Sequence, residues 1–195
     1  MGKVFKEITP EIADWVRRQR IFFVSTAPLA AEGLLNCSPK GMDTFRMLGP
    51  DEVAYLDLTG SGIETAAHLS ENARIVFMFC AFSGPPKIVR FHGVGVYHLA
   101  GSAAFERVAA SFPSLPGVRG MVRVQVTRIS DSCGYSVPKY EFVEERDTLV
   151  RWAEAKGEPA LQDYRAAKNE RSIDGLPGLP GAVPPGNHRQ TSGEP

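Results

Sequence analysis

Alternating apolar and polar positions are the clearest pattern in this chain. Between residues 118 and 129, Val122, Val124 and Val126 alternate with charged and polar residues. A period of two predicts a strand with one buried and one solvated face, which is typical of antiparallel sheets. Further strand-like runs occur at residues 21–27, 34–39, 44–48, 53–58, 74–82 and 88–99. The pattern therefore predicts a mainly β, antiparallel fold.

Turn sequences connect some of these runs into pairs. The segment PLAAEG (28–33) separates the first two runs, and GPDE (49–52) separates the next two. Strand-like runs that flank a few turn-forming residues are typical of β-hairpins. We therefore predict two hairpins in the first 58 residues.

Helix signals are short in the first part of the chain. Thr9 supplies a capping hydroxyl and Pro10 suits the first helical position, which predicts a helix that ends near Arg20. Two further short helices are predicted around residues 62–72 and 103–110. These helices interrupt the strands without alternating regularly with them.

The pattern changes to helical from Glu144 onward. Leu149, Trp152 and Ala153 fall on one side of this predicted helix, whereas residues 173–195 contain five Pro and five Gly and no aromatic residue, so they cannot fold alone. Strands followed by helices predict an antiparallel β-barrel with appended helices. The predicted division is a barrel domain at 1–143, a helical extension packed on it at 144–172, and a Pro/Gly-rich tail at 173–195.

Composition and charge are those of an ordinary globular chain. Of 195 residues, 43 % are hydrophobic, and 22 Lys and Arg balance 22 Asp and Glu, so no nucleic-acid surface is indicated. No apolar run approaches the roughly 20 residues of a membrane helix, and the N-terminus has no signal-peptide pattern. Cys37, Cys80 and Cys133 form no CxxC, and carboxylates do not cluster near the histidines. We expect a cytoplasmic protein without a metal site.

The turn Thr59-Gly60-Ser61-Gly62 is the first candidate anion site. Ser61 and Glu64 fit the S-x-x-E capping box, in which both side chains satisfy free amides at a helix start. Amides and the positive dipole end of the same helix also suit an anion, so capping alone and phosphate binding both remain open. A dinucleotide fingerprint is less favoured, because Thr65 stands where its third glycine is needed and no Asp or Glu ends the next strand.

The segment NCSPKG (36–41) is the second candidate. Lys40 offers a charge and Ser38 a hydroxyl, and Pro39 fixes the backbone between them. A solvated turn lysine is the alternative when this motif is taken alone. Together with the turn at 59–62, the motif favours a site for one phosphate.

The strand at 88–99 carries a third set of candidates. Arg90 and His92 share one face, and Gly93 and Gly95 the other. Strand glycines allow the close approach of a flat ligand or another backbone, or they mark a bulge or barrel bend. Arg90 is therefore either a rim charge or a phosphate ligand.

No catalytic set of acid, base and nucleophile emerges from the sequence. Ser61 lacks the G-x-S-x-G setting of an activated serine. Cys133 has no neighbouring cation and is expected to be a small buried residue. His68 follows Glu64 by four residues and is expected on a helix surface.

Several separated blocks, taken in order, resemble the pyridoxamine 5'-phosphate oxidase-like family of FMN-binding split barrels. The blocks are NCSPKG, SPKGMDTFRML, YLDLTGSGIETAAHLSEN, GPPKIVRFHG, SCGYSVP and KNERSIDGLPGL. They cover roughly residues 5–180 and are most similar to a bacterial branch of this family. The resemblance implies an antiparallel split β-barrel that forms a homodimer and binds FMN at the subunit interface.

The resemblance also implies which residues hold the flavin. Side chains of the second and third strands and the next helix start would bind the phosphate, and the backbone at Asn36 and Cys37 would meet the ring edge. This chain has TGSGIET where the oxidase itself has a basic turn. This chain also ends in helices and a Pro/Gly-rich tail, where the oxidase has a segment that grips pyridoxal phosphate. Oxidation of pyridoxamine phosphate is therefore not implied. The full set of expected cofactor-binding residues is Asn36, Cys37, Ser38, Lys40, Thr59, Gly60, Ser61, Thr65 and Arg90.

The expected function is a flavin-dependent oxidoreductase that acts on a small molecule. A bound flavin explains why the chain has residues suited to bind a phosphate but no catalytic set, because the flavin carries the hydride chemistry. Two alternatives remain open. One is a non-catalytic module that binds flavin or haem, with His92 or His98 as an iron ligand, and the other is a deazaflavin-dependent reductase.

Overall fold

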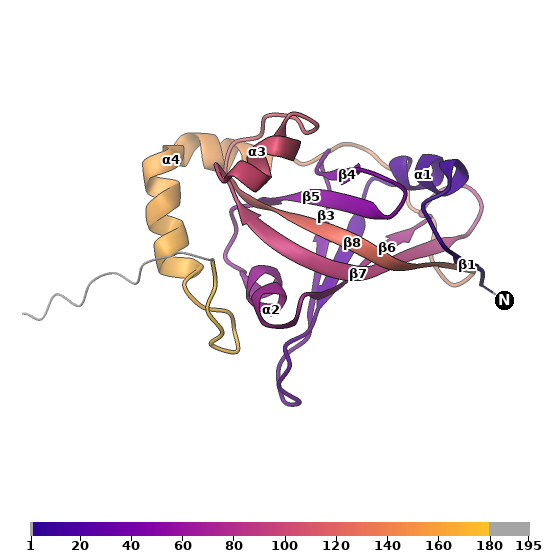
Figure 1. Cartoon of the computed structure of the whole chain (residues 1–195). Helices are drawn as coiled ribbons and strands as arrows, with labels where there is room; N and C mark the ends of the chain where they lie inside the picture. Colours follow the sequence, from indigo (N-terminus) through magenta and orange to yellow (C-terminus); the bar gives the residue numbers. More distant parts are fainter. Residues whose placement is uncertain (1, 180–195) are drawn as a thin grey trace, which may run out of the picture.

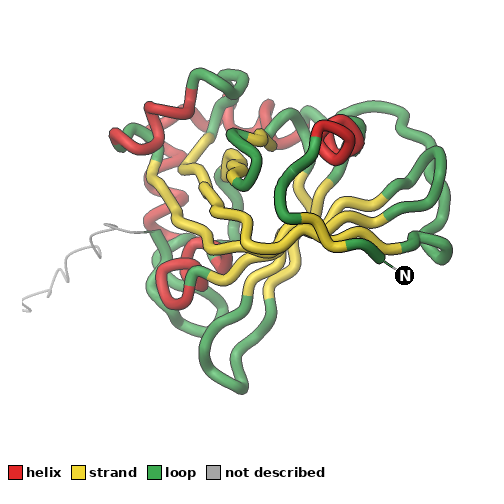
Figure 2. The backbone as a smooth tube through the Cα atoms, turned by 45° about the vertical axis from the view of Figure 1, so that its right-hand side comes forward, coloured by secondary structure: helices red, strands yellow, loops and turns green. Residues whose placement is uncertain are grey.

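Eight antiparallel strands form one curved sheet in the computed structural model, which describes residues 2–179 (Figure 1). In space the strands follow the order β3-β2-β6-β7-β8-β5-β4, and β1 pairs with β8. Figure 2 shows that the sheet curls strongly and is not flat. The strands are β1 (Val4–Phe5), β2 (Phe22–Thr26), β3 (Asn36–Lys40), β4 (Phe45–Met47), β5 (Glu52–Leu58), β6 (Arg74–Cys80), β7 (Ile88–Leu99) and β8 (Val118–Ser132).

The alternating pattern of β8 places one face in the core. Val122 and Val124 are completely buried, whereas Gln125 between Val124 and Val126 is exposed. The concave side of the sheet also collects aromatic rings, with Phe77 in contact with Phe22 and Tyr55. The predicted mainly β, antiparallel fold is confirmed, and so are the two hairpins, β2–β3 and β4–β5.

Four helices flank the sheet: α1 (Pro10–Arg17), α2 (Glu64–Asn72), α3 (Ala103–Ala109) and α4 (Thr148–Lys168). The hydroxyl of Thr9 accepts a hydrogen bond from the amide of Ile12, as predicted, although α1 ends at Arg17 rather than near Arg20. In Figure 1, α4 stands at the end of the sheet opposite β1. Gly157, with φ 67°, breaks α4 into two parts just before Pro159.

Packing within the chain explains the two glycines of strand β7, Gly93 and Gly95. The β7–β8 register shifts between His92 and Gly93, and a Cβ on Gly93 would lie 2.4 Å from the carbonyl oxygen of Gln125. A Cβ on Gly95 would lie 3.0 Å from Leu69. The bulge is therefore the correct alternative here, because neighbouring chain atoms occupy the space that a flat ligand would need.

The beginning of the predicted tail is folded back on α4. Arg171 bridges to Pro177, and the amide of Gly178 donates to the carbonyl of Glu170 at 2.8 Å. Leu179 packs on the main hydrophobic core. The rest of the predicted tail, residues 180–195, lies outside the described residues. In the described part of the chain, every helix is too short or too polar to cross a membrane.

Candidate functional site

A polar cavity of about 340 Å³ opens where the end of β3, the end of β5 and the start of α2 meet. The two segments that the sequence singled out, 36–41 and 59–62, therefore lie together. The first belongs to the β2–β3 hairpin, whereas the second connects β5 to the start of α2. Six of the nine predicted cofactor-binding residues line this cavity: Asn36, Ser38, Lys40, Thr59, Gly60 and Thr65.

The other three predicted residues lie elsewhere. Cys37 is exposed on the opposite face of β3, because side chains alternate along a strand. Ser61 is exposed and does not line the cavity. Arg90 lies on the outer face of β7 and donates to the hydroxyl of Ser132 at 3.0 Å. Arg90 therefore does not line this cavity.

A buried ion pair forms one wall of the cavity. The guanidinium of Arg119 donates to both carboxylate oxygens of Asp57 at 2.8 and 3.3 Å, and the two side chains are 6 % and 3 % exposed. The hydroxyl of Tyr97 adds a third hydrogen bond to Asp57 at 3.0 Å. Burial alone would lower the pKa of Arg119, but Asp57 outweighs it and the pKa is raised. Arg119 therefore stays charged across the physiological range.

Arg119 and Asn169 together hold the turn at 60–62 by its carbonyl groups. Arg119 donates to the carbonyls of Gly60 and Gly62 at 3.2 and 2.8 Å. The Asn169 amide donates to the carbonyls of Gly60 and Ser61 at 2.9 and 3.3 Å, and its oxygen accepts from Arg119 at 2.9 Å. In a trans peptide the N–H of the next residue points opposite to the C=O. The amides that follow the carbonyls of residues 60–62 therefore point away from the Arg119 and Asn169 side chains that hold these carbonyls.

These contacts replace the predicted capping box. Helix α2 begins at Glu64 with Ile63 at its N-cap, and no side chain caps it. Ser61 lies two residues before the N-cap, and Arg119 and Asn169 hold the turn in front of the helix. The Glu64 carboxylate accepts instead from the amide of Ile173 at 3.4 Å. The capping prediction was therefore wrong.

The donors that face the cavity differ in how far they are already used. Within residues 2–179, the structure shows no hydrogen bond from the Lys40 ammonium or the Ser38 hydroxyl, and Lys40 lies 3.9 Å from Asp57. Thr59 donates its hydroxyl to the carbonyl of Gly117 at 2.7 Å and accepts from Arg165 at 2.8 Å. Thr59 therefore shapes the cavity, whereas Lys40 and Ser38 have donors to spare.

A buried polar network continues from the cavity into the core. The amide of Asn36 donates to the hydroxyls of Thr65 and Thr26 at 3.0 and 3.2 Å, and Thr26 bonds His68 Nδ1 at 2.9 Å. His68 is completely buried, so the prediction of a surface histidine was wrong. Helix α2 packs on β2, β6 and β7, which buries a wider face than an amphipathic helix normally has.

The burial of His68 leads us to expect that the protein loses stability in mild acid. Burial lowers its pKa below 6.5, although Asp174, Glu64 and Glu71 act in the opposite direction. The unfolded chain then binds a proton more readily than the folded one, so stability is complete above pH 6.5 and falls as the pH decreases toward the lowered pKa.

We expect the free energy of unfolding to decrease between pH 7 and pH 5, by up to about 1.4 kcal/mol per pH unit for each such histidine. Burial also lowers the pKa of His92 and His98, so they add to the slope. Urea unfolding at several pH values gives the dependence of the free energy of unfolding on pH, and this dependence should be weaker for His68→Leu than for the parent chain. An unchanged slope would refute this assignment.

Among residues 2–179, the remaining histidines and cysteines do not gather at the cavity. His92 and His98 lie on β7 and line neither this cavity nor the larger one beside it. Cys133 is exposed, contrary to the prediction of a buried residue, because it follows β8 in an open loop. Across residues 2–179, no group of three His, Cys, Asp or Glu side chains is placed to hold a metal ion.

Comparison with known proteins supports the resemblance. Residues 8–133 match the family described as pyridoxamine 5'-phosphate oxidase. The pyridoxamine 5'-phosphate oxidase family protein ustO of Aspergillus flavus is 34 % identical over 198 residues, which cover 92 % of this chain and 78 % of that protein. A HupZ variant from Group A Streptococcus shares the fold, with a TM-score of 0.50 and 22 % identity over 64 % of this chain and 99 % of that one. The chain therefore belongs to the pyridoxamine 5'-phosphate oxidase family.

Proposed function

We propose that this chain is a flavin-dependent oxidoreductase that binds FMN in the polar cavity and works as a homodimer with the flavin at the subunit interface. Family membership supports a flavin, and the convergence of Ser38, Lys40 and Thr65 on one cavity is the observation that carries the proposal. When bound, the flavin supplies the hydride chemistry, and the protein supplies binding and orientation.

The donors of the cavity fit one phosphate group. Lys40 provides a positive charge that lies 3.9 Å from Asp57 and makes no hydrogen bond to it, and Ser38 and Thr65 provide hydroxyls. Arg119 does not add a free charge, because Asp57 neutralises it at 2.8 Å. Glu64 also lines the cavity with a negative charge. A single phosphate with one strong cation contact therefore suits this site better than a pyrophosphate.

Lys40→Ala should weaken FMN binding far more than riboflavin binding, because only FMN presents a phosphate. A hydrogen bond to a charged group contributes about 1.5–3 kcal/mol, so the FMN dissociation constant should rise about 10- to 100-fold. Fluorescence titration of the flavin measures both ligands. Lys6, which is exposed and remote from the cavity, provides the control variant Lys6→Ala.

A variant with the opposite sign sharpens this experiment. Glu64→Gln removes the negative charge that lines the same cavity and keeps an oxygen that can accept from Ile173. It should tighten FMN binding and leave riboflavin unchanged. Equal effects of Lys40→Ala on FMN and riboflavin would show that Lys40 does not contact the phosphate.

The function itself is tested by reconstitution. The purified chain is mixed with FMN, and its visible spectrum is recorded before and after anaerobic addition of NADPH, while light scattering gives its mass. Bound FMN that NADPH reduces, in a particle of twice the chain mass, supports the proposal. A chain that remains colourless and shows no FMN affinity would overturn it, and bound FMN that no donor reduces would favour a non-catalytic flavin module.

A further inference from the structure

A second, larger cavity adjoins the polar one. Its volume is about 1070 Å³, and the two cavities share the residues from Pro39 to Met42 and Leu149. Met42 has φ 57°, a left-handed conformation that is uncommon for a residue other than glycine and is often found at functional sites. The strained turn thus stands where the two cavities meet.

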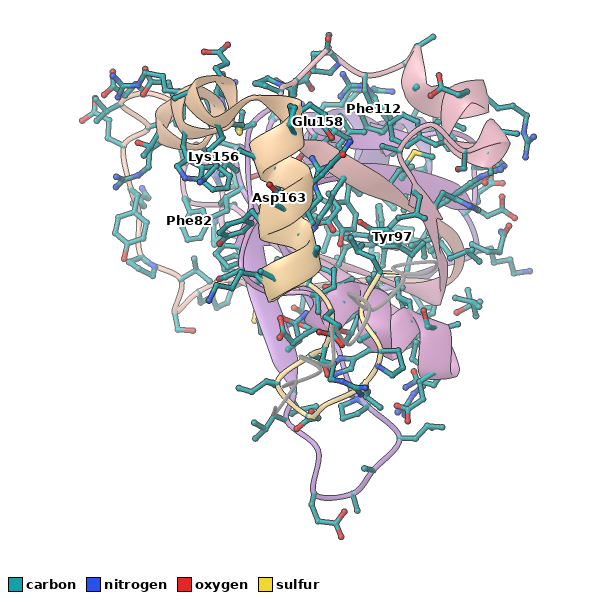
Figure 3. All side chains as sticks on the ribbon, turned by 90° about the vertical axis from the view of Figure 1, so that its left-hand side faces the viewer. Phe82, Tyr97, Phe112, Lys156, Glu158 and Asp163 are labelled. Carbon is teal, nitrogen blue, oxygen red and sulfur yellow. The ribbon has the colours of Figure 1, made fainter. Side chains whose placement is uncertain are left out.

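Five aromatic side chains line this second cavity, which we call the aromatic chamber. The ring centroids of Phe82 and Tyr140 lie 5.5 Å apart with the ring planes tilted by 38°, and the amide of Tyr140 donates to the carbonyl of Phe82 at 2.9 Å. The guanidinium of Arg20 lies 4.8 Å from the Phe142 ring. In Figure 3, Phe82 lies beside α4, on the side that also carries Lys156. The aromatic lining residues are Phe23, Phe82, Tyr140, Phe142 and Trp152.

The charges around the aromatic chamber nearly cancel. Four basic side chains line it, and three acidic ones face them. Arg20 is already engaged with the Phe142 ring. The chamber therefore has an excess of only one positive charge for a phosphorylated ligand, and one of its four cations, Lys40, is shared with the first cavity. The charged lining residues are Arg18, Arg20, Lys40 and Arg146 on one side of the balance, and Glu141, Glu144 and Glu145 on the other.

One wall of the chamber comes from outside the part of the chain that matches the family. The family match covers residues 8–133, whereas Tyr140, Phe142 and Trp152 belong to the segment that follows. This segment lies along the barrel and meets it through the backbone contact between Tyr140 and Phe82. The chamber is therefore built partly by the segment that follows the family match, which is where a difference in ligand choice within the family is expected.

We propose that the aromatic chamber binds a bulky, uncharged aromatic molecule and that this molecule represents the substrate class of the site. Pockets of about 300–1,000 Å³ with mostly apolar walls typically bury drug-sized ligands, so the chamber accommodates more than a single ring. Aromatic walls favour planar ligands by offset and edge-to-face stacking. The role as a substrate rests on the proposed flavin function, whereas binding itself does not.

The test uses 2-naphthol as the neutral probe and 2-naphthyl phosphate as its charged counterpart, titrated into the full chain without flavin and followed by probe fluorescence. Tyr140 and Phe142 are 63 % and 49 % exposed, so the double variant Tyr140→Ala/Phe142→Ala should fold. Removing both rings should weaken 2-naphthol binding about tenfold or more. Tyr135→Ala is the matched control, because Tyr135 lies in the same segment, is 83 % exposed and does not line the chamber.

The outcomes separate this proposal from the flavin function. Saturable 2-naphthol binding that the double variant loses and Tyr135→Ala keeps supports it. No 2-naphthol binding in a chain that binds FMN overturns the chamber proposal and leaves the flavin function standing. Equal or tighter binding of 2-naphthyl phosphate overturns the uncharged class. If the double variant instead halves the particle mass in light scattering while 2-naphthol fails to bind, a second copy of the chain fills the chamber, and the proposal is wrong.

Discussion

Arg119→Met is expected to lower the free energy of unfolding by about 3–5 kcal/mol, because it leaves the buried carboxylate of Asp57 without its partner. Arg119 also donates to the carbonyls of Gly60 and Gly62, and the variant releases both. Equilibrium unfolding in urea measures the loss through a lower midpoint at an unchanged slope.

The chain offers a matched control on its surface. Arg17 pairs with Asp14 at 2.6 Å, but both side chains are exposed, so Arg17→Met should cost no more than about 1 kcal/mol. Adding Asp57→Leu to Arg119→Met should restore part of the stability, because it removes the unpaired charge. Equal losses for Arg119→Met and Arg17→Met would contradict the role of the buried pair.

Phe77→Ala is the second substitution expected to have a large effect. Its ring is completely buried and lies 5.4 Å from Phe45 and 5.8 Å from Tyr55, so truncation opens a cavity at the centre of the core. We expect a loss of about 3–5 kcal/mol in the free energy of unfolding, with a smaller loss for Phe77→Leu. The exposed Leu35 provides the comparison, because Leu35→Ala should change stability by less than about 0.5 kcal/mol. A thermal melt of the three variants would refute the assignment if they unfolded together.

The strands could be predicted because each one buries a single face, and this leaves a period of two in the residues themselves. The alternation of Val122, Val124 and Gln125 is such a local signal. The order of the strands has no comparable signal: β2 pairs with β6 across an intervening hairpin and helix. His68 was misplaced for a related reason, because the burial of α2 depends on three strands that are distant in sequence.

The candidate site was predictable in the two segments 36–41 and 59–62 and not in the residues that support them. Ser38 and Lys40 stand out as a hydroxyl and a cation at the end of a predicted strand. Asp57 and Arg119 interrupt apolar strands, and that interruption is a signal of a buried pair that sequence reasoning could have used. Asn169 gives no local signal at all, because it contacts Gly60 across 109 positions of the chain.

That distance has a consequence for how the protein is made. The turn at 60–62 leaves the ribosome early, whereas Asn169, which donates to the carbonyls of Gly60 and Ser61, is among the last described residues to be synthesised. Because synthesis proceeds at about 5–20 residues per second and the N-terminal part folds first, the sheet has time to form before the turn receives its final support. Completion of the cavity is thereby deferred until Asn169 has been synthesised, and we expect a chain that stops short of Asn169 to form the strands without a finished cavity.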